Sequence, residues 1–422
     1  MSISLDRKKE IILKLYTFIS LFIFSIVTLN GNTFFADIVV SYIQANKVFV
    51  HLGVTVLFII ITLPIMIKDK VKIDGILISL FIFNLTVIMH IFDTNYDVTQ
   101  FWGNYLNIII SLITYFIFMQ YSGNYNKIIN IFTLFGVLLS IQVLLTALIN
   151  QVPISNIYYK TYMRIPFAAS NIISSAILPI IFLTKLSLGK SLKRDVFIGI
   201  MVVGVIFTKS RTGLILLILF WIICMYKNID KNKYKNSKYM LLTIFVIIFL
   251  MIFLTREKTV EILIGYANKS NLSIDSLSSG RLSIFIKEIQ RGLGNFIFGT
   301  GIGYEKGALS GAHNILIDLF VQTGISGVTN YIVAITILFR LRRHIKYDYQ
   351  KGLLIFLYIL FINSMVEVCY LNYINDVLFW SIAGLLRSSI NLTESKRYNN
   401  NEMENYNDEK GLSFVYSYAN KK

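Results

Sequence analysis

One arginine occupies a position where positive charge is doubly unfavourable. Arg211 lies in the run Lys209–Gly213, at the outer start of an apolar segment that is predicted to cross a membrane. A cation on the outer side departs from the positive-inside tendency, and the helix dipole repels a cation at a helix N-terminus. A phosphate would compensate both effects, because guanidinium groups and helix N-termini each bind one. We expect Ser210 to contact the same anion; the alternative is an interfacial arginine held by lipid headgroups.

A histidine and an asparagine stand directly before a later apolar run. His313 is the only histidine at a predicted outer helix start, and Asn314 follows it. A neutral imidazole there can accept a proton from an attacking hydroxyl group or orient a phosphate, and we assign Asn314 to the same binding site. The alternative is a histidine that only caps the helix at the membrane interface.

The remaining candidates are one buried acid and several outer cations. Glu367, with Asn363 one turn earlier, lies inside a predicted span, where an ionisable group is expensive and is expected to face a cavity or a partner. Pairing with an arginine would explain Glu367 equally well. The cations expected to bind substrate or to be solvated surface charges are Arg281, Arg291, Lys160 and Arg164.

Several kinds of chemistry are excluded by what the motifs lack. The glycine run 299–303 has no glycine at the sixth position, follows no βαβ unit and has no Lys-Ser/Thr ending, so it predicts neither a dinucleotide nor an ATP site. The four histidines are scattered, and Cys224 and Cys369 both lie in predicted spans, so we expect no metal centre and no disulfide framework. We therefore expect no cofactor, and the substrate itself must supply the driving force.

The elements that position these residues are membrane-spanning helices. The 422 residues are 55% hydrophobic and only 15% charged, with a mean hydropathy of +0.65. The apolar runs are long enough to cross a hydrocarbon core about 30 Å thick. The predicted spans are 11–29, 48–67, 76–92, 103–121, 128–149, 171–188, 196–208, 212–226, 240–254, 314–339, 352–370 and 373–388.

Basic residues orient the chain across the membrane. The lysine- and arginine-rich segments follow an even number of predicted spans, which places them and both termini in the cytoplasm. They are 7–9, 68–72, 190–194, 227–238 and 340–346. The net charge of +17 is therefore a topological signal plus contact with anionic lipid, and it gives no support for nucleic-acid binding.

The predicted organisation is one transmembrane domain, 1–390, and a polar, disordered cytoplasmic tail, 391–422. The outer side carries a middle loop, 150–170, and a long loop, 255–312. Within the long loop, Leu282, Phe285, Ile286 and Ile289 recur at helical spacing, which predicts an amphipathic helix on the membrane surface. A long loop with its own helix and glycine turns is more often functional than idle.

Three signatures then occur in one order along the chain. They are Ser210–Gly213 at an outer span start, Ser279–Arg281 in the long loop, and the glycine run 299–303 followed by Ala312–Asn314 and Gly324–Gly327. Over about 205–330 this set resembles the O-antigen ligase and Wzy-type polymerase family of bacterial surface polysaccharide assembly. The resemblance implies an all-α polytopic membrane protein of about 12 transmembrane helices, GT-C-like, in the bacterial cytoplasmic (inner) membrane.

The resemblance also implies an activity and roles for three residues. It implies a glycosyltransferase that needs neither metal nor nucleotide, with a glycan on undecaprenyl pyrophosphate as donor and a hydroxyl of a second lipid-linked repeat unit as acceptor. Arg211 and Arg281 match the family arginines that grip the pyrophosphate, and His313 matches the histidine that activates or positions the acceptor. We expect a polymerase, and a chain-length regulator is a possible partner; a ligase, or a flippase of lipid-linked oligosaccharides, is the alternative.

Overall fold

The computed structural model describes the chain in separate ranges. These are 5–25, 53–60, 72–92, 98–121, 123–149, 170–227, 281–302, 312–366 and 375–393. Within them every regular element is a helix and no strand occurs, so the all-α class is confirmed for this part of the chain. The predicted span 240–254, the middle outer loop, most of the long outer loop and the tail beyond 393 lie outside the described residues.

The described helices overlap the predicted spans that fall within these ranges. Their bounds are α1 (Leu5–Ser25), α3 (Gly75–Ile88), η1 (Met89–Phe92), α4 (Val98–Met119), α5 (Tyr125–Ile149), α6 (Ser170–Ser187), α7 (Leu192–Phe207), α8 (Arg211–Lys227), α11 (Arg281–Gly294), α12 (Ile315–Arg340), η3 (Leu341–His344) and α13 (Asp348–Ser364). Two further helices cover 53–60 and 375–393.

Three described helical segments are long and apolar enough to cross a membrane by themselves. They are Tyr125–Leu148, Ser170–Ser187 and Ile315–His344, and Gly75–Ile88 and Ile108–Met119 are shorter apolar helices. The chain therefore has the helices of a membrane protein, while a dozen crossings and the cytoplasmic position of both termini stay predictions.

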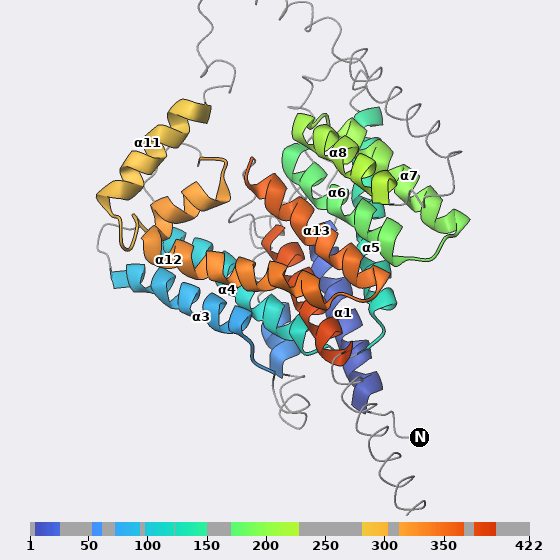
Figure 1. Cartoon of the computed structure of the whole chain (residues 1–422), viewed down its shortest axis with the longest axis horizontal. Coiled ribbons are helices and arrows are strands. Elements are labelled where there is room, and N and C mark those ends of the chain that lie inside the picture. The colour runs from blue at the N-terminus through green and yellow to red at the C-terminus, as the bar shows by residue number, and fades with distance from the viewer. Residues whose placement is uncertain are drawn as a thin grey trace, which may run out of the picture.

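The centre of the bundle is α6, which is apolar on nearly every side. Its residues from Ile173 to Leu183 are buried without interruption. A helix that is apolar all round must pack on several sides at once, and α6 contacts α5, α7, α8 and α13. Figure 1 shows α5 to α8 on one side of the molecule, α3, α4 and α12 beside one another on the other side, and α13 between the two groups.

A polar cluster ties helix ends together on the side assigned to the cytoplasm. One oxygen of Asp74 accepts a hydrogen bond from the Leu77 backbone N–H (2.9 Å) and so caps α3. The other oxygen accepts from the Tyr115 hydroxyl on α4 (2.7 Å) and from Arg387 Nε on the 375–393 helix (3.1 Å). A mostly buried carboxylate is tolerated here because donors satisfy both oxygens. The cluster sets a common level for the three helices.

A sharp kink divides α12 into two unequal parts. Gly324 has φ 62° and ψ −167°, a combination that glycine alone adopts without strain, so the helical pattern breaks there. The first part is 315–323 and the longer part begins at Ile325. The single straight span predicted for 314–339 is therefore replaced by a broken helix, and Figure 1 shows the two parts of α12 running in different directions.

The backbone groups that the kink releases are taken up by the glycine turn after α11. Carbonyls of Val321 and Gln322 accept from the N–H groups of Thr300 (2.7 Å) and Gly301 (2.9 Å). In return, the N–H groups of the two residues after the kink donate to carbonyls of the turn: Ile325 to Phe296 (2.8 Å) and Ser326 to Ile297 (3.2 Å). In an unbroken helix the Val321 carbonyl would accept from the Ile325 N–H, and the Gln322 carbonyl from the Ser326 N–H. The kink breaks these two hydrogen bonds, and the turn supplies a new partner for each of the four groups.

Two glycines permit this close approach. A Cβ on Gly324 would lie 2.3 Å from the Ile297 carbonyl oxygen, and a Cβ on Gly299 would lie 2.5 Å from the backbone nitrogens of Thr323 and Gly324. We call these two glycines and the four backbone hydrogen bonds the glycine lock. His90 Nε2, at the end of the α3 region, lies 2.7 Å from the Phe298 carbonyl oxygen and holds the same turn.

Candidate functional site

The first corner of the candidate site is the turn from α7 to α8. Ser210 Oγ accepts a hydrogen bond from the Gly213 N–H (3.2 Å), so this serine caps α8. Gly213 lets α8 approach α6, because a Cβ there would lie 2.8 Å from the Ser174 Cβ. Ser170, the first residue of α6, donates its hydroxyl to the Thr208 carbonyl. The predicted binding residue Ser210 is fully buried and has a capping role, while the turn is fixed against α6.

The two cations of this corner have opposite environments. Lys209 is buried at φ 57°, and burial lowers the pKa of its ammonium group. Arg211 is exposed at the first position of α8, and the ion pairs among the described residues do not include it. Its guanidinium is therefore available to an anion, beside N–H groups at the start of the helix.

The second corner is the start of α12. Asn314 Oδ1 accepts from the backbone N–H groups of Leu316 (3.0 Å) and Ile317 (3.2 Å), and its Nδ2 donates to the Met365 carbonyl just after α13 (3.0 Å). Asn314 therefore caps one helix and ties it to the end of another. This is a structural role that the sequence analysis did not assign.

His313 is held next to this cap in a left-handed backbone conformation. Its φ is 54°, a conformation that is uncommon for residues other than glycine, although asparagine, aspartate and histidine adopt it more often than the rest. The residue before it, Ala312, donates its N–H to Asp318 Oδ1 (2.6 Å), one turn into α12. The residues on both sides of His313 are thus hydrogen bonded, so the helix start and its cap hold the backbone from which the imidazole projects.

The helix predicted in the long outer loop is present as α11, and its charges are not all solvated. Glu288 is buried, and its Oε2 accepts from Arg291 Nη1 (3.2 Å). Arg291 Nη2 also lies 3.4 Å from Thr300 Oγ1 in the glycine turn. Arg291 therefore links α11 to the lock. Gly292 packs against Phe320 of α12, where an added Cβ would lie 2.6 Å from the ring.

The opposite face of α11 is apolar and exposed. Ile286, Ile289 and Leu293 are between 40% and 57% exposed, and the exposed apolar surface continues through Phe296 to Phe298 in the turn. In a membrane protein such a surface suits the apolar part of the bilayer interface, as the sequence predicted for this helix.

The predicted site residues divide into those that the structure places and those outside it. Arg211 and Ser210 lie at one corner, His313 and Asn314 at the other, and Arg291 on α11. Arg281 is the first residue of α11, but its side chain is outside the described part, as are Lys160, Arg164 and Glu367. The 375–393 helix lies near elements of both corners, since Asn375 Nδ2 donates to Ser175 Oγ of α6 (3.0 Å) and Asn375 lines a cavity together with Ile315 of α12.

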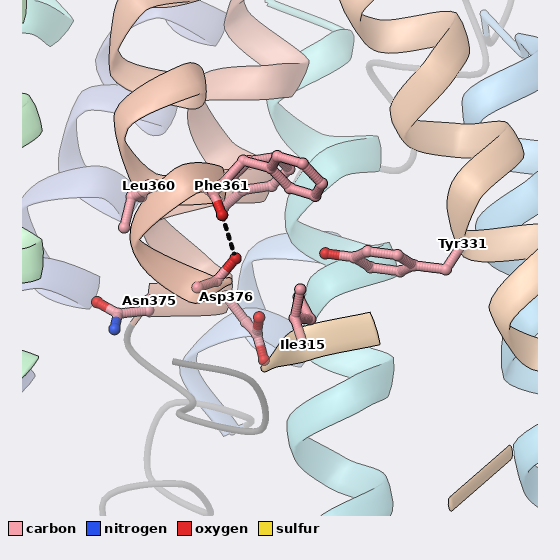
Figure 2. Close-up of a pocket in the computed structure, with 8 residues that line it drawn as sticks. Ile315, Tyr331, Leu360, Phe361, Asn375 and Asp376 are labelled. Carbon is pink, nitrogen blue, oxygen red and sulfur yellow. Dashed lines mark hydrogen bonds between the residues drawn. The ribbon is translucent and has the colours of Figure 1, made fainter. Parts of the chain in front are cut away.

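A cavity with several polar lining residues, which includes Ile315 at the second corner, was not predicted from the sequence. Ile315, Tyr331, Ser364, Asn375 and Asp376 are among the residues that line it. Figure 2 shows the Tyr331 hydroxyl turned towards Asp376 and Ile315. An aspartate near the start of the predicted span 373–388 was the available signal.

Metal ligation finds no support in the described part of the chain. Within it, no group of three or more His, Cys, Asp or Glu side chains is close enough to hold an ion. That the protein works without metal or cofactor stays a prediction.

Comparison with known proteins identifies the middle of the chain. Residues 196–332 match a protein-family model described as O-antigen ligase. The match runs from α7 into the longer part of α12, beyond the kink, and its range includes Arg211, Arg281 and His313. No curated protein matches the chain. The resemblance seen in the sequence is thus confirmed for these residues, and it supports a membrane enzyme of polysaccharide assembly.

Proposed function

The chain carries an O-antigen ligase family domain at residues 196–332, and from this premise we propose that it is a polysaccharide polymerase. It joins undecaprenyl-pyrophosphate-linked oligosaccharide repeat units at the outer face of the bacterial cytoplasmic membrane. The observation that carries the proposal is Arg211: within the matched region, it is an exposed guanidinium at a helix N-terminus with no carboxylate partner among the described residues.

The proposed reaction is one displacement at the anomeric carbon of the donor. The acceptor hydroxyl oxygen forms the new bond to this carbon, the bond from the carbon to the pyrophosphate oxygen breaks, and the hydroxyl proton goes to the His313 imidazole. Charge builds on the leaving pyrophosphate as the bond breaks. Arg211, the N–H groups of α8 and Arg281 stabilise that charge, which is greater in the transition state than in the bound donor.

The sugar–pyrophosphate bond supplies the free energy, so the proposed reaction needs no nucleotide. The glycine lock gives the arrangement its rigidity. The lock joins two helical segments at their C-terminal ends. One is α11, which begins at Arg281, and the other is the first part of α12, which follows His313. A catalytic group must be held to well under an ångström, and two elements fixed to one backbone junction provide this.

A ligase is the second candidate, favoured by the description of the matching family. A ligase would use the same donor, arginines and histidine but transfer the glycan to a different acceptor. A flippase would need cations for the pyrophosphate inside a central cavity, whereas Arg211 is at an exposed helix start.

Purified protein in liposomes with a synthetic undecaprenyl-pyrophosphate repeat unit separates these candidates. A polymerase produces a ladder of longer lipid-linked chains from this single substrate, and EDTA does not change the ladder. A ligase gives no ladder until a separate acceptor such as a lipid-A core is added. A flippase moves substrate between leaflets without forming any bond. No product from a verified repeat unit would contradict the polymerase proposal.

A further inference from the structure

Two neighbouring cavities share two residues in the interior of the bundle. Tyr331 and Asp376 line both of them. The first lies between α12, α13 and the 375–393 helix (Figure 2). The second lies between α3, α4, α12 and the same helix, and its polar lining residues are Asn84, Ser111, Tyr331 and Asp376. Asp376 is therefore an acid at the junction of its own helix with α3, α4, α12 and α13.

The depth of this junction follows from helix geometry. The Asp74–Arg387 pair sets α3 and the 375–393 helix at one level. Asn84 lies ten residues beyond Asp74 and Asp376 eleven residues before Arg387, so at a rise of about 1.5 Å per residue each lies roughly 15 Å from the pair. That is about half of a hydrocarbon core some 30 Å thick. Both helices thus bring polar groups to a similar level on the outer side of the pair, where Ile315, at the outer start of α12, also lines the first cavity.

Among the described residues that line the two cavities, the side chains around Asp376 supply acceptors and hydroxyls but no positive charge. Tyr331 is the only other titratable side chain of this described lining. The ion pairs of the described residues do not include Asp376. An ionised carboxylate that faces such cavities inside a helix bundle without a counter-charge is disfavoured.

An amide oxygen of a residue that lines the same cavity as Asp376 also lacks a hydrogen-bond donor among the described residues. Asn84 is buried, and its Nδ2 donates to the Leu80 carbonyl (2.8 Å), which fixes the identity of the two amide atoms. Its Oδ1 has no hydrogen-bond partner among the described residues. A buried acceptor normally has a hydrogen-bond partner, so an unfilled acceptor and a carboxylate that line one cavity favour a species that brings positive charge.

We propose that Asp376, Asn84 and Tyr331 form a site for one monovalent cation, either a proton or an alkali-metal ion. Its single positive charge neutralises Asp376, and an alkali-metal ion would also be coordinated by the Asn84 oxygen and the hydroxyls of Tyr331 and Ser111. This goes beyond the proposed glycosyl transfer. EDTA resistance of that reaction would not bear on it, because EDTA does not remove alkali-metal ions.

Trp380 lines the second cavity and can report on the site directly. In a Trp102→Phe/Trp221→Phe background it is the only tryptophan left of three. Its emission is measured in two arms. One is a pH titration with N-methylglucamine as the only buffer cation, and the other is a NaCl or KCl titration at fixed pH, with N-methylglucamine chloride as the ionic-strength control.

The proposal expects a saturable change of Trp380 emission in at least one arm. A response to pH without alkali metal identifies the proton, and a response to Na⁺ or K⁺ but not to N-methylglucamine identifies a metal ion. Asp376→Asn removes the response, and Asp376→Glu keeps it with a shifted midpoint. Asp348→Asn, which changes an exposed acid outside the cavities, leaves the response unchanged.

A flat emission in both arms, or a response that survives in Asp376→Asn, overturns the proposal. If Asp376→Asn does not fold, an unshifted midpoint in Asp376→Glu overturns it. The readout needs no substrate, so it fails or succeeds independently of the proposed polymerase activity.

Discussion

Replacing Gly324 by alanine tests the glycine lock, the junction on which α11 and the start of α12 depend. The new methyl group would lie 2.3 Å from the Ile297 carbonyl oxygen and 2.6 Å from the Gly299 nitrogen. Both are backbone atoms, so no side chain can rotate away to make room. The φ of 62° with ψ −167° adds strain for any residue with a Cβ.

The magnitude follows from the two ways in which the protein can respond. Keeping the lock costs about 1–3 kcal/mol of backbone strain and about 1–3 kcal/mol for the overlap. Releasing it loses four backbone hydrogen bonds, each worth roughly 1 kcal/mol net, so about 4 kcal/mol together. The two responses are similar in free energy. We therefore expect a loss of about 3–4 kcal/mol and a lock that opens locally.

Hydrogen exchange measured by mass spectrometry distinguishes local opening from general unfolding. The backbone amides of Thr300, Gly301, Ile325 and Ser326 should lose protection, while amides of α6 should not. Gly294→Ala is the matched control, since a Cβ at this glycine in the same segment meets nothing within 4 Å. Gly299→Ala should act like Gly324→Ala, and the double variant should be little worse than either, because both break one junction. Unchanged protection in Gly324→Ala would refute the lock.

Four further predictions concern the site and its topology. Arg291→Ala leaves the buried carboxylate of Glu288 unpaired and should lower the free energy of unfolding by about 1–3 kcal/mol. The double variant Glu288→Gln/Arg291→Met should recover part of this loss in thermal unfolding. An unchanged unfolding midpoint in Arg291→Ala would mean that the pair does not stabilise the fold. Asn314→Ala should lose about 1 kcal/mol, whereas Asn314→Asp keeps the cap of α12 and loses only the bond to Met365, so its unfolding midpoint should fall between those of alanine and wild type. Arg211→Lys should reduce polymer length in cells nearly as much as Arg211→Ala, because lysine keeps the charge but not the bidentate geometry, and full activity of the alanine variant would leave the residue an anchoring role only. Cysteines at Ser276 and Asn236 should be labelled in intact cells at Ser276 alone, and labelling at Asn236 alone would invert the topology.

The sequence predicted much of the fold because its signals are local. Apolar spacing predicted α11, and the serine before Arg211 lies where the cap of α8 forms. Local signals could not predict the kink at Gly324. A glycine in a long apolar run is tolerated in a helix, and its conformation here depends on the turn 296–301, which is more than twenty residues away in sequence.

The same reason explains what was missed in the candidate site. Arg291 looks like a solvated charge on a surface helix until the burial of Glu288 and the position of Thr300 are known. Asp376 acquires its significance from Asn84, nearly three hundred residues earlier, because the pair Asp74–Arg387 brings the two helices to one level. Sequence spacing carries no information about such partners.

The central claim is tested most directly by counting undecaprenyl pyrophosphate released for each glycosidic bond formed. Metal-free purified protein is given one lipid-linked repeat unit, and both products are measured by mass spectrometry. The proposed mechanism predicts one released lipid pyrophosphate per new bond, with a loss of about 100-fold or more in rate for Arg211→Ala, as for other groups that stabilise developing charge. Bond formation without release of lipid pyrophosphate, or an equal rate in Arg211→Ala, would contradict it.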